Sequence, residues 1–199
     1  LEPIKNKAEI LFVDGGSTDR TLSLIPEEYS VLKSLKGRAK QMNYGAQMST
    51  GDVLFFLQCD SELPKQALEQ IEEVLQSHQW GCFGIAFHSK HPLMICCQVI
   101  SNHRILDRKV VFGDQGIFVK RDLFFEVGGF PEIPIMEDYQ FSLTMKERGE
   151  KIGIAKSRIY TSDRRFEKGK RLKIIFQTRF LKFTRTAYFV AVFAPLMSA

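Results

Sequence analysis

The chain lacks the short motifs that mark several common classes of site. Its four cysteines (Cys59, Cys82, Cys96 and Cys97) form no C-x-x-C pair, so their spacing argues against a zinc site and favours buried thiols in a reducing compartment. There is no G-x-G-x-x-G and no G-K-[ST] sequence, so neither dinucleotide binding nor P-loop phosphate binding is supported. The apolar stretch 186–199 has 14 residues and is too short to span a bilayer by itself.

The composition is that of a folded globular domain, but its charge is unevenly distributed. Of the 199 residues, 44% are hydrophobic and 26% are charged, which is ordinary for a chain that buries its own core. The formal net charge is +5, yet 156–185 alone holds eleven Lys or Arg and two Asp or Glu. This basic stretch indicates contact with an anionic partner or a membrane surface, and a solvated helix face is the alternative.

Strand and helix patterns alternate along the chain. Continuous apolar runs at 9–13 and 53–57 predict strands buried on both faces. Further strands are expected at 29–35, 81–87 and 116–119, and helices at 38–48, 64–77, 92–106, from 122, at 137–148 and at 170–193. The alternation predicts an α/β fold with a mostly parallel central sheet flanked by helices. Ligands of such sheets bind at the carboxyl ends of the strands.

Acidic residues occur at three places where such a ligand would bind, and at each place the residue could instead have a purely structural role. Asp14 ends the first strand in a D-G-G-S turn, which suits close approach of a nucleotide but is also an ordinary tight turn. Asp60 follows the 53–57 strand and could bind a cation together with a diphosphate, or cap a helix. Glu137 and Asp138 follow G-G-F-P; they could supply a base, or favourable charge at a helix N-terminus.

The order and spacing of these phrases resemble the family 2 glycosyltransferases of GT-A fold over about 9–167. The matching phrases are 14–21, Gly37-Arg38-Ala39, Gly51-Asp52-Val53, Asp60, Gly128-Gly129-Phe130 and Glu137-Asp138. Longer phrases are similar to the bacterial subgroup called radical-SAM/selenodomain-associated transferase 2. These are 37–43, Gly113-Asp114-Gln115, 129–138 and 162–167.

The resemblance implies a role for each matching residue. Asp138, with Glu137 beside it, would be the catalytic base of an enzyme that inverts the anomeric centre. Asp60 would bind a divalent cation, Mg²⁺ or Mn²⁺. The donor nucleotide would contact Asp14, Gly15, Gly16, Ser17, Arg38, Arg164 and Arg165. The acceptor side would include Gly113, Asp114 and Gln115.

The chain departs from the family pattern at three places. The usual D-x-D metal motif reads Gln58-Cys59-Asp60, and Gly15 stands where many relatives carry a second acidic residue. The first strand of the family, with its P-x-x-N-E-like phrase, is missing. We therefore expect a GT-A domain over 1–169, preceded in the natural protein by one more strand, and a basic, apolar helical segment over 170–199.

The expected function is transfer of a sugar from a nucleoside-diphosphate sugar to an acceptor hydroxyl with a divalent cation. A catalytically weak sugar-nucleotide-binding protein and a nucleotidyltransferase are the alternatives. No nucleic-acid partner is expected. A cytoplasmic location is expected, with peripheral contact to the inner face of the membrane through 171–193. A homodimer is expected if the edge of the first strand is exposed.

Overall fold

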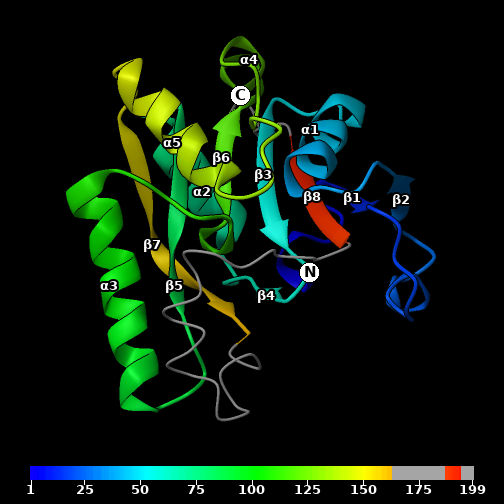
Figure 1. Ribbon diagram of the computed structural model, residues 1–199, viewed down its shortest axis with the longest axis horizontal. Helices are drawn as coiled ribbons and strands as arrows, with labels where there is room; N and C mark the ends of the chain where they lie inside the picture. The colour runs from blue at the N-terminus through cyan, green and yellow to red at the C-terminus, as the bar shows by residue number, and fades with distance from the viewer. Residues whose placement is uncertain (163–186, 194–199) are drawn as a thin grey trace.

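The computed structural model describes residues 1–162 and 187–193, which form an α/β structure around one eight-stranded sheet (Figure 1). The strands are β1 (Glu9–Asp14), β2 (Ser30–Lys33), β3 (Val53–Gln58), β4 (Ser61–Glu62), β5 (Trp80–Ala86), β6 (Ile117–Lys120), β7 (Ile152–Thr161) and β8 (Ala187–Phe193). Their order across the sheet is β2-β1-β8-β3-β6-β5-β7-β4. The expected α/β class is confirmed.

Most strands of this sheet point in the same direction, yet most adjacent pairs are antiparallel, because strands of the opposite direction lie between them. β1 and β2 are parallel, as are β5 and β7. β8 lies antiparallel between β1 and β3, and β6 lies antiparallel between β3 and β5. Consequently β1, β2, β3, β5 and β7 point the same way, and their carboxyl ends meet at one edge. The prediction of a mostly parallel sheet is right for the direction of most strands and wrong for the pairing of adjacent strands.

Helices cover both faces of the sheet (Figure 1). The helices are α1 (Arg38–Met48), α2 (Ala67–Leu75), α3 (Pro92–Arg108), α4 (Arg121–Glu126) and α5 (Glu137–Glu147), with 3-10 turns η1 (Glu2–Ile4), η2 (Leu22–Leu24) and η3 (Gly113–Gln115). One core contains side chains from α1, α4 and α5, and the other contains side chains from α2 and η1. None of the helices in the described ranges has the length and apolar character that a bilayer crossing requires.

β3 shows why a continuous apolar run forms a central strand. Successive side chains of a strand point to opposite faces, so Leu54 and Phe56 enter one core while Val53, Phe55 and Leu57 enter the other. All five are nearly inaccessible to solvent. Because both faces are covered by helices, every position of the run must be apolar.

The structure corrects the expected C-terminal helix. Residues 187–193 form β8, which pairs with β1 on one side and β3 on the other; 170–186 and 194–199 lie outside the described residues. A short apolar run fits a helix or a strand equally well, and here two neighbouring strand edges decide the outcome. β1 therefore has a neighbouring strand on each side, β2 and β8, and the further strand expected before residue 1 stays a prediction. The exposed β1 edge on which dimerisation was expected is covered by β8.

Two smaller expectations also change. β7 was not predicted, because its sequence I-G-I-A-K-S-R-I-Y-T alternates buried with exposed positions and contains few large apolar residues. Such alternation is typical of a strand with one solvated face. The cysteines are not all buried thiols, because Cys59 and Cys96 are exposed and only Cys82 is fully buried. Burial raises the pKa of the Cys82 thiol.

Gly153 in β7 allows α2 to approach the sheet closely. A Cβ at this position would lie 2.1 Å from Val74 Cγ1 and 3.1 Å from His78 Cγ. We expect Gly153→Ala to lower the free energy of unfolding by about 1–3 kcal/mol, because an added methyl forces packed groups apart. Urea unfolding measures the loss.

Val74→Ala supplies the matched test, because it removes the first atom that the new methyl would meet. The loss caused by Gly153→Ala should be smaller in the Val74→Ala background than in the wild type. Equal losses in the two backgrounds would show that the contact between α2 and β7 is not what requires glycine.

Candidate active site

Glu137 and Asp138 begin α5, and both are buried. Their relative exposures are 0% and 1%. Acidic residues in the first turn of a helix are ordinarily stabilised by the helix dipole while remaining solvated, so the simple capping interpretation does not account for this burial. Met136, just before the helix, has a left-handed backbone with φ 68°. A non-glycine residue rarely adopts this conformation, and it occurs here at the turn that directs both carboxylates inward.

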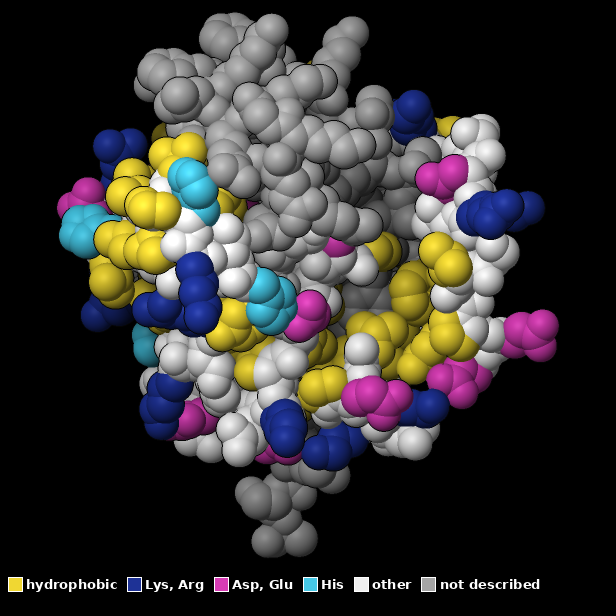
Figure 2. Space-filling view, turned by 90° about the horizontal axis from the view of Figure 1, so that it is seen from below, with side chains coloured by type: hydrophobic (Ala, Val, Ile, Leu, Met, Phe, Trp, Pro, Cys, Tyr) yellow, Lys and Arg dark blue, Asp and Glu magenta, His cyan; other side chains and the backbone are white. Residues whose placement is uncertain are grey.

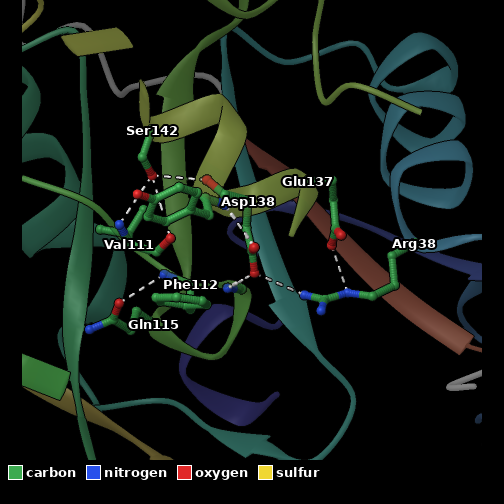
Figure 3. Close-up of polar contacts among 9 residues, drawn as sticks. Arg38, Val111, Phe112, Gln115, Glu137, Asp138 and Ser142 are labelled. Atoms are coloured by element: carbon green, nitrogen blue, oxygen red, sulfur yellow. Dashed lines mark hydrogen bonds and ion pairs between the residues drawn. The ribbon is translucent and has the colours of Figure 1, made fainter. Parts of the chain in front are cut away.

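Arg38 lies against both carboxylates (Figure 3). It is the first residue of α1, a hundred positions away in the sequence. Its Nε lies 2.7 Å from Glu137 Oε1, and its Nη2 lies 3.1 Å from Asp138 Oδ2. The Arg38 side chain is only 14% exposed. One guanidinium therefore compensates two buried acidic groups, and the planar fork of arginine suits this geometry.

Glu137 is the more deeply placed of the two groups. Arg38 is the principal electrostatic partner of its carboxylate, through Nε at 2.7 Å from Oε1. Burial raises the pKa of Glu137, Arg38 opposes the rise, and the neighbouring Asp138 charge adds to it. Glu137 therefore serves to fix Arg38 beside Asp138, and it differs from Asp138 in having no contact with the adjoining loop.

Asp138 is held in one orientation by three donors. Its Oδ2 accepts hydrogen bonds from Gly113 N at 2.6 Å and from Arg38 Nη2 at 3.1 Å. Its Oδ1 accepts from its neighbour Tyr139 N at 2.8 Å. A carboxylate oxygen has more than one acceptor position, so a further hydroxyl could still donate to this group. The arrangement gives a single oriented carboxylate between α1, α5 and η3.

The loop that supplies Gly113 is fixed by two buried side chains (Figure 3). Ser142 of α5 accepts from Val111 N at 3.1 Å and donates to Asp138 O at 2.9 Å. Gln115 accepts from Phe112 N at 2.9 Å, and its amide donates to Ser101 O of α3 at 3.4 Å. Gln115 is fully buried, so it supports the loop, and its place on the acceptor side, which the resemblance implied, stays a prediction.

A side chain at Gly113 would crowd the polar groups around it. A Cβ there would lie 2.5 Å from Arg38 Nη2, 3.3 Å from Asp138 Oδ2 and 3.4 Å from Gln58 Nε2. The same contacts show that Gln58, the residue that replaces the first acid of D-x-D, lies beside the Asp138 group. Sequence reasoning treated Gln58 only as a missing metal ligand.

Asp114 and Arg104 extend this polar group toward α3. Asp114 is half-buried, and burial together with the Asp138 charge raises the pKa of its carboxyl, while Arg104 and Arg38 oppose the rise. Burial lowers the pKa of the Arg104 guanidinium, which lies over the Phe112 ring at 3.9 Å from its centroid. Arg104 carried no motif signal, and only its place on α3 brings it here.

At the end of β1, Asp14 shapes the turn that follows it. Its carboxylate accepts from Gly16 N at 3.0 Å, from Ser17 N at 3.0 Å and from Ser17 Oγ at 2.5 Å, and the residue is only 4% exposed. Asp14 therefore holds the loop, and its contact with the nucleotide, which the resemblance implied, stays a prediction. Gly16 is exposed with φ 93°, and Ser17 is half-buried, so these two remain available to a ligand.

Packing explains why position 15 holds glycine, where many relatives carry an acidic residue. A Cβ at Gly15 would lie 2.9 Å from the side chain of Gln41, which itself donates to Val13 O at 2.9 Å. The Gln41 side chain of α1 therefore occupies the space that a larger residue at position 15 would need. Gly15 is buried, and its contact with the nucleotide stays a prediction.

The G-G-F phrase connects α1 to the loop before α5. Asn43 accepts from Phe130 N at 2.9 Å and donates to Phe130 O at 2.8 Å. Gly129 has φ 70°, and a Cβ there would lie 2.8 Å from Asn43 Oδ1. The phrases 37–43 and 128–130 are thus two sides of one contact, which positions the start of α5 relative to Arg38.

Asp60 lies at the carboxyl edge, two residues after β3, and is half-buried. Within residues 1–162 and 187–193, no three His, Cys, Asp or Glu side chains gather into a metal-binding group. Any cation here would depend on ligand oxygens as well as on Asp60. Arg164 and Arg165, which the resemblance placed at the donor diphosphate, lie outside the described residues, so their role stays a prediction. Of the other expected site residues, the structure brings together Arg38, Gly113, Glu137 and Asp138.

Part of the chain is similar in sequence to known proteins. Residues 3–90 match glycosyl transferase family 2. An uncharacterised glycosyltransferase of Haemophilus influenzae is 26% identical over 155 residues, which cover 69% of this chain and 51% of that protein. The matched segment 3–90 contains Asp14, Arg38 and Asp60, whereas Gly113 and Asp138 lie beyond it.

Solved structures share the fold. The S. aureus TarS fragment 1–349 superposes with a TM-score of 0.57 at 17% identity, over 76% of this chain and 50% of that one. Its complex with UDP-GlcNAc gives 0.56, over 76% and 48%. The mannosyltransferase PcManGT from Pyrobaculum calidifontis, in complex with GDP-Man and Mn²⁺, gives 0.51 at 19% identity, over 72% and 46%. The fold is therefore GT-A, and the chain spans about half the length of these relatives.

The contact between Arg38 and Glu137 leads to a stability prediction. Arg38→Met leaves a buried carboxylate uncompensated and should lower the free energy of unfolding by about 3–5 kcal/mol at neutral pH. Without Arg38, the pKa of Glu137 should rise further. A carboxyl with a raised folded-state pKa stabilises the fold at low pH and loses that contribution as pH rises, so the deficit should be smaller near pH 5 than near pH 8.

Urea unfolding at the two pH values measures this effect. Adding Glu137→Gln to Arg38→Met should restore part of the lost stability, since the buried charge is removed. Lys40→Met on the same helix is the matched control, because Lys40 pairs with Glu132 only at the surface, at 3.9 Å, and should cost at most about 1 kcal/mol. A loss for Arg38→Met as small as for Lys40→Met would contradict the assigned role.

Proposed function

We propose that the protein is an inverting glycosyltransferase that moves a sugar from a nucleoside-diphosphate sugar to an acceptor hydroxyl. The observation that carries the proposal is the single oriented carboxylate of Asp138, buried at the edge of a GT-A sheet where the strands end. The family 2 match and the glycosyltransferase neighbours support the reaction class. The phrases 37–43, 113–115, 129–138 and 162–167 support the radical-SAM/selenodomain-associated subgroup as the closer affiliation.

Asp138 is the general base of the proposed reaction. As the acceptor oxygen attacks the anomeric carbon, its proton becomes acidic and passes to a carboxylate oxygen within hydrogen-bond reach. Gly113 N and Arg38 Nη2 fix that carboxylate before substrate binds, so little reorganisation is needed during the reaction. The bond from the anomeric carbon to the nucleoside diphosphate breaks on the face opposite the attack, so the diphosphate leaves and the transferred sugar has an inverted anomeric configuration.

Glu137 and Arg38 are positioning residues in this scheme. Glu137 holds the guanidinium by its Nε, which leaves the Nη2 side directed at Asp138. Asp114 and Gly113 line the neighbouring loop, and we assign this side to the acceptor. The exposed turn at Gly16 and the half-buried Ser17 are assigned to the donor nucleotide, and the basic residues Arg164 and Arg165 to its diphosphate.

A divalent cation would fit the proposed site if Asp60 and the phosphate oxygens of the substrate bound it together. Mg²⁺ and Mn²⁺ prefer oxygen ligands, and one or two carboxylates suffice when substrate phosphates complete the shell. Asp60 supplies one such carboxylate, and the described residues offer no group of three. When bound, the ion would stabilise the negative charge that develops on the departing diphosphate. The PcManGT structure contains Mn²⁺ together with GDP-Man, which supports this arrangement by analogy of fold.

The base assignment is tested with Asp138→Asn. UDP-GlcNAc and GDP-mannose serve as donor probes, and release of nucleoside diphosphate reports transfer to water or to an added acceptor. We expect turnover to fall by about 100- to 10,000-fold, the usual contribution of a general base, while donor affinity changes little. Asp52→Asn, at an exposed aspartate, is the control for a neutralised carboxylate. Near-normal turnover by Asp138→Asn would remove Asp138 from the base role.

The metal assignment is tested by nucleotide binding. Thermal unfolding of the wild type with UDP or GDP should show a larger stabilisation in Mn²⁺ than in EDTA. A nucleotide at 100 times its dissociation constant adds about 2.7 kcal/mol. Asp60→Asn should abolish the difference between Mn²⁺ and EDTA, whereas Glu62→Gln, at an exposed residue paired with His88, should retain it. Equal binding by the wild type in Mn²⁺ and in EDTA would exclude a metal-dependent donor site.

A further inference from the structure

α3 is the least buried of the long helices in the described part of the chain. It has 17 residues, but only Met94 and Ile105 are buried. By comparison, the nine-residue helix α2 has five buried residues. α3 therefore lies beside β5 with most of its surface outside the core.

Four large apolar side chains of α3 are exposed to solvent. Ile95, Val99, Ile100 and Leu106 are exposed by 49%, 58%, 65% and 59%. Residues 95, 99 and 106 recur at helical spacing and share one face, whereas Ile100 lies about 100° further round the helix than Val99. In Figure 2, hydrophobic side chains gather on the side of the molecule where Figure 1 places α3, with basic and histidine side chains beside them. A contiguous apolar patch of this kind usually marks a contact surface.

The charges around this face are almost all positive. Lys90 precedes α3, and Arg108 and Lys109 are exposed at its end. Within 88–109, Asp107 is the only acidic residue, and His88, His91 and His103 add groups that can take a proton. An exposed apolar face with basic residues at both ends is typical of a helix that lies in the interface of an anionic bilayer.

We propose that the outward face of α3 docks on an anionic lipid bilayer. Ile95, Val99 and Leu106 enter the boundary between headgroups and acyl chains, and the basic residues at the two ends of the helix, Lys90 and Arg108, attract the anionic headgroups. A second copy of the chain is disfavoured, because a symmetric contact would bring the basic ends of two α3 helices together. The stretch 163–186 is itself strongly basic in sequence, so charge also disfavours it as the occupant.

The inward side of α3 connects this surface to the candidate active site. Ser101 O accepts from Gln115 of η3, and Arg104 lies over Phe112. The docked face is therefore about one helix diameter, roughly 10 Å, from the loop that holds Asp138. Docking is measured by lipid binding alone, so its test does not depend on the proposed sugar transfer.

The test uses the full chain and sedimentation with phosphatidylcholine vesicles, with and without phosphatidylglycerol. The wild type should bind the anionic vesicles more tightly. Ile95→Gln/Val99→Gln should weaken that binding about tenfold or more, since each buried aliphatic side chain contributes about 1.5–3 kcal/mol. Lys90→Gln/Arg108→Gln should weaken it about fivefold per residue, and only on anionic vesicles.

Leu22→Gln/Leu24→Gln is the matched control, since these residues are also exposed, by 37% and 79%, but lie on η2. It should bind as the wild type does. Val99→Trp should give a tryptophan emission that shifts to the blue on binding and is quenched by brominated lipid, above the background of the buried Trp80.

Three results would overturn the proposal. The first is absence of binding by the wild type to anionic vesicles. The second is binding that the Ile95→Gln/Val99→Gln variant retains in full, which would place the lipid contact elsewhere on the chain. The third is a dimer, seen by light scattering, that only this variant loses, which would assign the face to a second copy of the chain.

Discussion

Glu137 and Asp138 are adjacent carboxylates buried at the start of one helix, and Arg38, at the start of another, contacts both. Two buried negative charges would be unstable without a cation that remains ionised. Arginine remains ionised under all ordinary conditions. The position of α1 relative to α5 is therefore constrained by charge compensation as well as by apolar packing. The candidate site exists only while these two helix ends meet.

The glycines and amides around this contact follow from it. Gly113 brings its N–H to Asp138 because any side chain would strike Arg38. Gly129 allows Asn43 to bind both backbone groups of Phe130, which sets the loop before α5. Motif residues that are far apart in the sequence are thus parts of one rigid arrangement. Their principal task is to hold a few polar atoms in place, and the surface of α3 adjoins the same loop.

The elements of the fold could largely be predicted from local pattern. The bounds of α1 agree with the 38–48 pattern, and the strands around 9–13, 53–57 and 81–87 are present. The prediction did not find β7, whose alternation of small and charged residues is a weak signal. It assigned 187–193 to a helix, because a short apolar run does not reveal its neighbours. Strand order and pairing depend on contacts between distant segments.

At the candidate site, the sequence by itself determined which residues are the candidates for the chemistry. The phrases around Arg38, Asp60, Gly113 and Asp138 mark those positions, because each requires a particular side chain or none. Only the tertiary structure decided what each one does. It showed that the carboxylate of Asp14 is used by its own turn, that Gln41 fills the space beside Gly15, and that Arg104 approaches η3. The physical reason is that a motif specifies residue types at fixed spacing, whereas hydrogen-bond partners and burial arise when segments up to a hundred residues apart pack together.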